Sequence, residues 1–160
     1  HYLHSLLSDD ESFYARFARA IEQFDTPLGF FAQLLTREKN GEATLDIKKG
    51  GIFPIVHGIR SLALRHGIAA CNTFDRLQRL AELGHLERDF ANDISETLAF
   101  LLGLRLSHGL ADLADGRAAS NLIRPDRLST LEKDLLKDAL GLVKKFKNLL
   151  RHQFRLGAVA

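Results

Sequence analysis

The chain has 160 residues, of which 46% are hydrophobic and 26% charged, and its formal net charge is +2. This length and composition predict one globular domain with its own core, and the small net charge argues against a protein whose main task is to coat nucleic acid. One cysteine, Cys71, excludes an intramolecular disulfide, and no apolar run approaches the roughly 20 residues of a membrane-spanning helix, so we expect a cytoplasmic protein.

The first third of the chain begins with helical signals and then loses them. Ser8 and Glu11 form a capping-box pattern that predicts a helix ending near Phe24, and a second helix is predicted over residues 25–35, with Thr26 as its N-cap and Pro27 at its first position. Residues 36–51 contain the turn pair Asn40-Gly41 and lack helical periodicity, with short extended pieces expected over residues 43–47.

Helical periodicity returns and continues to the end of the chain. Helices are predicted over residues 54–67, from residue 72 or 73 to 83, and over 87–114, where "LAFLLGLRL" is apolar on nearly every side and marks a central helix. A connector over residues 116–129 precedes a last helix, which the Ser129–Glu132 capping box starts and which ends near Phe154. We therefore predict an all-α fold: a single helical bundle of about six helices over residues 1–160, with one long central helix and a Gly/Lys-rich loop. The chain contains no methionine, and we expect it to be the C-terminal part of a longer multidomain protein.

The Gly/Lys-rich loop lies in the segment "LDIKKGGIFPIVHGIR", residues 45–60. Two adjacent glycines, Gly50 and Gly51, can expose backbone amides just before a helix N-terminus, where an anion is favoured. Lys48 and Lys49 would add positive charge at that place, and Asp46 could hold one of these lysines or lie near a metal ion. The alternative is a solvated connector, which the loop residues alone favour.

Two polar groups of residues on the helices are further candidates for a binding site. His57 and Arg60 share the polar face of the helix that follows the loop. Arg105 and His108 form a polar strip with Asp112 on the otherwise apolar central helix. Because a buried arginine needs a partner, Arg105 must meet a carboxylate such as that of Asp46, carbonyl groups or a bound anion.

Patterns that would give this chain an activity of its own are absent. There is no G-x-S-x-G elbow, no H-E-x-x-H motif and no carboxylate pair of the kind a nucleotidyl transferase needs. No metal site is predicted either, because His108 and Asp112 lack further ligands nearby. We expect the chain by itself to be catalytically inert. The basic last helix offers only weak support for binding of nucleic acid.

Four blocks in this order resemble a known family: "TLDIKKGGIFPIVHGIRSLALRHGI", "NTFDRLQRL", "FLLGLRLSHGL" and "PDRLSTLEKDLLKDALGLVKKFKNLL". Over residues 13–154 the chain is similar to the nucleotidyltransferase substrate-binding domain, the helical C-terminal domain of bacterial signal-transduction proteins. The resemblance singles out as site residues Asp46, Lys48, Gly50, Gly51, Arg60, Asn72, Arg105 and His108.

The resemblance implies a division of labour between this domain and the rest of a longer protein. A nucleotidyltransferase domain would hold the catalytic metal, so that Mg²⁺ and a nucleoside triphosphate are expected for the full-length protein, and this domain would bind the nucleotide or the acceptor. CBS domains and a cyclic-nucleotide-binding-like domain would be further partners in the same chain. The alternative is a non-catalytic interaction module, which would include the case of a homodimer.

Overall fold

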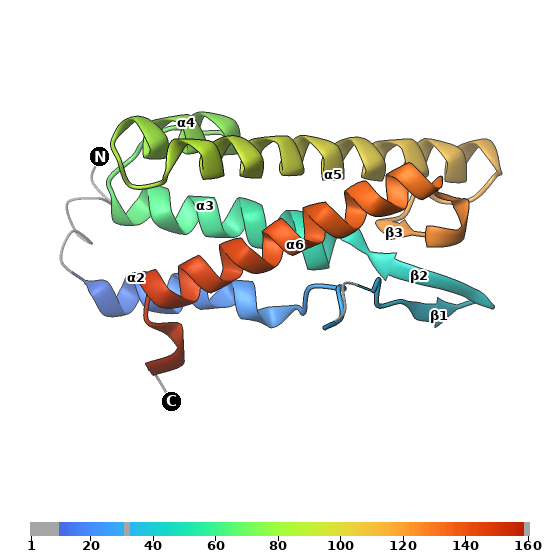
Figure 1. The fold of residues 1–160 in the computed structure, drawn as a ribbon, viewed down its shortest axis with the longest axis horizontal. Coiled ribbons are helices and arrows are strands. Elements are labelled where there is room, and N and C mark those ends of the chain that lie inside the picture. Colours follow the sequence, from blue (N-terminus) through green and yellow to red (C-terminus); the bar gives the residue numbers. More distant parts are fainter. Residues whose placement is uncertain (1–9, 31–32, 159–160) are drawn as a thin grey trace.

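The computed structural model describes residues 10–30 and 33–158, and its helices fill most of that part of the chain. The α-helices are α2 (Glu11–Ala18), α3 (Phe53–Arg65), α4 (Thr73–Glu82), α5 (Arg88–Ala114) and α6 (Thr130–Gln153). A 3₁₀ turn over Arg19–Gln23 extends α2, and further short 3₁₀ turns lie at Pro125–Arg127 and Leu156–Ala158. As Figure 1 shows, α5 runs along the length of the molecule beside α3, and α6 crosses them obliquely.

α2, α4 and α6 begin where short polar side chains accept hydrogen bonds from the first free amides of the helix. The side chain of Asn72 accepts from the backbone N–H of Asp75, Ser129 from that of Glu132, and Asp10 from that of Phe13. Such caps satisfy N–H groups that have no partner within the helix. The predicted cap of the first helix, Ser8, lies outside the described residues, and the start of α6 at Ser129 is confirmed.

The core lies between α3, α5 and α6. Its fully buried side chains include Ile59 and Leu62 from α3, Ile94, Leu98 and Leu101 from α5, and Leu140, Val143 and Phe146 from α6. Gly58 permits the close approach of α3 and α6, since a Cβ atom there would lie 2.5 Å from Leu150 Cδ1 and 2.6 Å from Phe146 Cε1. α5 packs against α4 and α6, but α2 packs on α3, and Leu102, Leu106, Leu110 and Leu113 on the second half of α5 are exposed. The predicted central helix therefore contributes to the core, but it is not buried on nearly every side.

A small antiparallel sheet lies at one end of the bundle (Figure 1). It consists of β1 (Arg37–Lys39), β2 (Glu42–Asp46) and β3 (Leu122–Ile123), in that order. The turn between β1 and β2 places Asn40 at φ 52° and Gly41 at φ 78°, the left-handed pair that a two-residue hairpin needs. In the register, Arg37 lies opposite Thr44 and Leu45 lies opposite Ile123.

The predicted all-α class is roughly right, because the described part of the chain is mostly helical, but the small sheet was not predicted as such. The extended piece expected over residues 43–47 is confirmed as β2. The helix predicted over residues 25–35 does not form in the described part of that segment: Leu28 instead makes a β-bridge with Leu34. Five α-helices lie in the described residues, against the six or so predicted.

Candidate functional site

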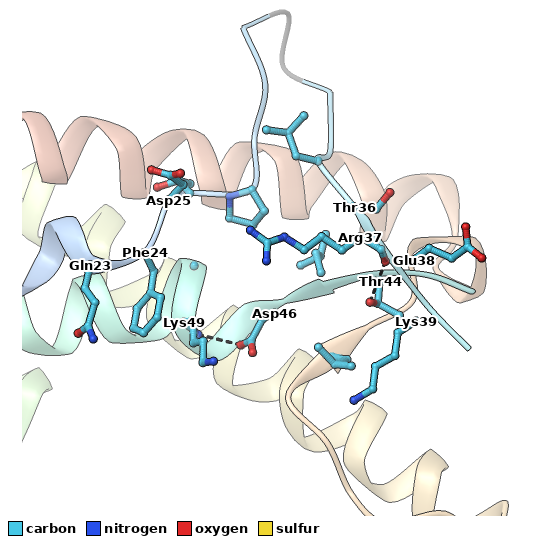
Figure 2. A pocket seen from close by; sticks show the side chains of 16 residues that line it. Gln23, Phe24, Asp25, Thr36, Arg37, Glu38, Lys39, Thr44, Asp46 and Lys49 are labelled. Atoms are coloured by element: carbon cyan, nitrogen blue, oxygen red, sulfur yellow. Dashed lines mark hydrogen bonds between the residues drawn. The ribbon is translucent and has the colours of Figure 1, made fainter. Parts of the chain in front are cut away.

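A pocket of about 650 Å³ lies where the β1–β2 hairpin meets the start of α3 (Figure 2). Its lining comes from residues 23–27, 35–39, 44–46 and 49–50, together with Leu122. We call it the hairpin pocket. Its volume falls in the range of small-molecule sites, about 300–1,000 Å³.

Three cationic side chains line the hairpin pocket: Arg37 and Lys39 from β1, and Lys49 from the turn before α3. None of them forms an ion pair with another residue in the described ranges. Figure 2 shows the Arg37 side chain directed across the pocket towards the segment that carries Asp25, whereas Glu38 points the other way. This alternation is what a strand imposes on successive side chains.

Asp46 and Lys49 are held together at the start of the helix. The Asp46 carboxylate accepts from the backbone N–H of Lys49 at 2.9 Å, so it already neutralises the positive helix end. The Lys49 ammonium forms no ion pair with that carboxylate or with another described residue, and it lies 5.3 Å from the centre of the Phe24 ring. Lys49 thus presents its charge on an aromatic support.

The wall opposite the hairpin is fixed from the core. Lys147 of α6 is only 3% exposed, and its Nζ donates to the carbonyl oxygen of Phe24 at 2.9 Å; burial lowers the pKa of this ammonium. Thr26, in the same wall, is buried, and its hydroxyl has no hydrogen-bond partner among the described residues. An unpaired buried hydroxyl is costly, and because this oxygen has almost no accessible surface, a ligand in the pocket would satisfy it only after a shift of the wall.

The Gly50-Gly51 pair is not a loop. It belongs to a π-helical turn, Lys48–Ile52, that continues directly into α3. A Cβ atom on Gly50 would lie 2.5 Å from Pro27 Cδ, and one on Gly51 would lie 3.1 Å from Leu101 Cδ1. Close packing therefore explains why both positions are glycines, and Gly50 also lines the hairpin pocket.

The candidate site residues predicted from the sequence lie in different places. Asp46, Lys49 and Gly50 line the hairpin pocket, and Lys48 is exposed beside it. His57 lies between the rings of Phe17 and Phe53, with ring centres 4.6 and 5.3 Å away. Its Nε2–H donates to the carbonyl oxygen of Phe17 at 2.7 Å, since a carbonyl can only accept.

The remaining candidates lie away from the hairpin pocket. Arg60 is exposed on α3, and Asn72 caps α4. Arg105 lines a different groove, next to residues 119–121, and forms no ion pair with Asp46 or any other described residue. His108 is half-buried on the same helix.

The predicted polar strip on α5 does not form one site: Asp112 is buried and paired with Arg124, whereas Arg105 lines a surface groove. Asp112 is 1% exposed and accepts from Arg124 Nη1 at 2.8 Å, and Arg124 Nε also donates to Glu42 at 2.6 Å. The Arg124 guanidinium holds the pKa of the Asp112 carboxyl below its usual value. This pair ties the hairpin and β3 to α5, so the role of Asp112 is to hold the sheet that bears the hairpin pocket.

Thr26, Arg37 and Lys39 were missed as site residues from the sequence. The Asn40-Gly41 turn was the available signal, because a two-residue hairpin places residues 37–39 opposite 42–44. No group of three or more His, Cys, Asp or Glu side chains in the described part of the chain is arranged to hold a metal ion. No helix in that part is long and apolar enough to cross a membrane.

The comparison with known protein families agrees with the family resemblance of the sequence blocks that surround the hairpin pocket. The family model described as "Putative nucleotidyltransferase substrate binding domain" matches residues 11–154. The chain belongs to this family. The match includes every strand and α-helix named above, so the hairpin pocket is a feature of this substrate-binding domain and not of an appended segment. No curated protein and no solved structure shows significant similarity to the chain.

Proposed function

We propose that the hairpin pocket is the substrate site of this nucleotidyltransferase-related domain, and that it holds the phosphates of a nucleotide. The observation that carries the proposal is a set of three cations, Arg37, Lys39 and Lys49, that form no ion pair with any described residue. They line a pocket of about 650 Å³ together with the acidic residues Asp25, Glu38 and Asp46. Arg37 suits a phosphate because its planar guanidinium can donate two parallel hydrogen bonds. Lys49 would supply a point charge from the opposite wall.

Chemistry in this proposal takes place on another domain. A nucleotidyltransferase domain of the same protein would hold Mg²⁺ and transfer the nucleotidyl group, while the hairpin pocket orients the nucleotide or the acceptor. By itself this chain would bind the nucleotide or the acceptor without catalysing nucleotidyl transfer. The full-length protein would be a cytoplasmic bacterial signalling protein, in which CBS and cyclic-nucleotide-binding-like domains belong to the same chain as the nucleotidyltransferase domain.

The test is calorimetric titration of the chain with a panel of nucleoside triphosphates in the presence of Mg²⁺. Arg37→Gln and Lys49→Gln should each weaken binding about tenfold, the scale of one charge-assisted hydrogen bond. Lys145→Gln is the matched control, because Lys145 is an exposed cation on α6 that does not line the pocket. If both pocket variants bind as the wild type does, the phosphate role is wrong.

A second candidate function is a non-catalytic interaction module, and one observation favours it. Several leucines on the second half of α5 are exposed, among them Leu106 at 64% and Leu113 at 58%. Large apolar side chains gathered on one face indicate a surface that another molecule covers. The two functions use different surfaces and are compatible with each other.

A further inference from the structure

The outer face of α5 changes character halfway along the helix. Over residues 88–97 its exposed positions include Arg88, Asp89, Asn92, Asp93 and Glu96. Over residues 101–114 the exposed positions are Leu102, Gly103, Leu106, Ser107, Leu110, Ala111, Leu113 and Ala114. None of these exposed positions is charged, although charged residues make up 26% of the chain, and the half-buried Arg105 lines the groove beside them. We call this surface the α5 leucine face.

The α5 leucine face borders a groove and is not covered by another described element. The groove has a volume of about 400 Å³ and lies between these leucines and residues 119–121. In Figure 1, α4 lies along the first half of α5 and stops before the leucine face begins. A surface of this kind on an isolated domain marks an interaction site.

The spacing of residues on the α5 leucine face makes it complementary to itself. If two α5 helices lie antiparallel about a two-fold axis at Leu106, Leu102 of each faces Leu110 of the other. In the same register Gly103 faces Gly109 and Ala99 faces Leu113, so that small residues face either each other or one large side chain. A Cβ atom on Gly103 would have no neighbour within 4 Å, so the glycine leaves room for close approach. A two-fold interface requires this kind of reciprocal match.

Charge at the edge of the face agrees with the same register. Glu96 is exposed and would come next to Arg117 of the other copy, and Arg117 would come next to Glu96 in return. Arg117 already contacts Asp115 at 3.3 Å and Glu42 at 3.9 Å within its own chain, and its side chain remains 42% exposed. The opposite signs at both ends of the stripe favour the antiparallel arrangement over a parallel one.

We propose that the α5 leucine face binds a second copy of this chain, forming a two-fold symmetric dimer with antiparallel α5 helices that meet at Leu106. The interface shares no lining residue with the hairpin pocket, so the dimer goes beyond the proposed nucleotide-binding function and does not depend on it.

Sedimentation equilibrium of the chain tests the dimer directly. The wild type should form dimers, and Leu106→Glu should raise the dimer dissociation constant at least about tenfold, because two carboxylates would meet in a dry interface. Leu131→Glu is the matched control: Leu131 is 69% exposed on α6 and lies outside the leucine face. A wild-type chain that stays monomeric at every concentration overturns the proposal, as does a dimer that Leu106→Glu leaves intact.

Disulfide trapping tests the register. Cys71 is the natural cysteine and is exposed, so the experiment uses a Cys71→Ser background. Leu106→Cys should then cross-link to itself under mild oxidation, because the axis passes through this position, whereas Leu131→Cys should not. Equal cross-linking of both variants, or of neither, overturns the antiparallel register. Circular dichroism confirms folding of each variant, and nucleotide titration reports separately on the hairpin pocket.

Discussion

Thr26 and Thr44 are two buried threonines in opposite walls of the hairpin pocket, and their hydroxyls differ in hydrogen bonding. Thr44 Oγ1 donates to the carbonyl oxygen of Arg37 at 3.0 Å, whereas Thr26 Oγ1 has no partner among the described residues. Replacing a satisfied hydroxyl by a methyl group loses a hydrogen bond, while replacing an unsatisfied one removes a desolvation cost. The same substitution should therefore have opposite effects at the two positions.

We expect Thr44→Val to lower the free energy of unfolding by about 1 kcal/mol and Thr26→Val to raise it by a similar amount. Urea denaturation of the free chain measures both values. If the Thr26 hydroxyl serves a bound nucleotide, Thr26→Val will also weaken nucleotide binding while making the protein more stable. Destabilisation of the free chain by Thr26→Val would show that the hydroxyl is already satisfied.

His66 gives the domain a predictable response to pH. Its ring is stacked on that of His85, with ring centres 3.6 Å apart. Burial, followed by the charges of His85 and Arg65, lowers the pKa of His66 below 6.5, and Glu11 acts in the opposite direction. The folded state therefore binds a proton less readily than the unfolded state, and the stability contributed by neutral His66 is lost as the pH falls below about 6.5.

The free energy of unfolding should accordingly decrease between pH 7 and pH 5, and His66→Gln should remove part of that decrease. Urea denaturation at several pH values measures the slope. His152→Gln, which changes an exposed histidine near the end of α6, is the control and should leave the slope as in the wild type. An unchanged slope in His66→Gln would contradict the assignment.

The helices that the sequence predicts well are those whose ends are set locally. The start of α4 at Thr73 and of α6 at Thr130 follow from caps within three residues, and the end near Leu83 follows from Gly84 at φ 76°. Such signals act through neighbouring backbone groups and do not depend on the rest of the fold. The long apolar run in α5 predicted burial on nearly every side, but Leu102, Leu106 and Leu110 are exposed, because no described element covers that face.

The elements that the sequence misses depend on distant contacts. Thr26 and Pro27 look like a helix start, but Pro27 packs against Gly50, and Leu28 pairs with Leu34 instead. β1 has no apolar alternation because all three of its residues are exposed, and β3 pairs with β2 across some 80 residues of sequence. The site was only partly predictable for the same reason: Lys49 was found from its own segment, and Arg37 was not.

Close packing of α3 against α6 leads to a prediction for two glycines. Gly58→Ala would place a Cβ atom 2.5 Å from Leu150 Cδ1 and 2.6 Å from Phe146 Cε1, and the resulting overpacking should cost about 1–3 kcal/mol. In Gly141→Ala, the new Cβ atom would have its nearest neighbour, Leu28 Cδ2, at 3.9 Å. That variant should gain about 0.5–1 kcal/mol from helix propensity. Thermal unfolding measures both, and equal effects would contradict the packing argument.

Over the whole molecule, positive charge is less available than the sequence suggests. The last helix looks basic, yet Lys147 is buried and donates to Phe24, and Arg151 donates from Nη2 to Glu22 at 2.9 Å. Arg124, Arg117 and Arg127 are likewise engaged by Glu42. Arg37, Lys39 and Lys49 of the hairpin pocket form no ion pair with the described residues, and the net charge of the chain is only +2. This arrangement suits a small anion better than a long polyanion.

We therefore expect the chain to bind single- or double-stranded oligonucleotides only weakly at physiological salt, with a dissociation constant of about 100 μM or higher, at the weak end of non-specific binding. Fluorescence anisotropy with labelled oligonucleotides over a salt series measures this. Lys145→Gln should change the signal no more than Lys49→Gln does, because neither belongs to a continuous basic track. Micromolar affinity that falls steeply with salt, and that Lys145→Gln weakens, would instead assign the basic face of α6 to nucleic acid.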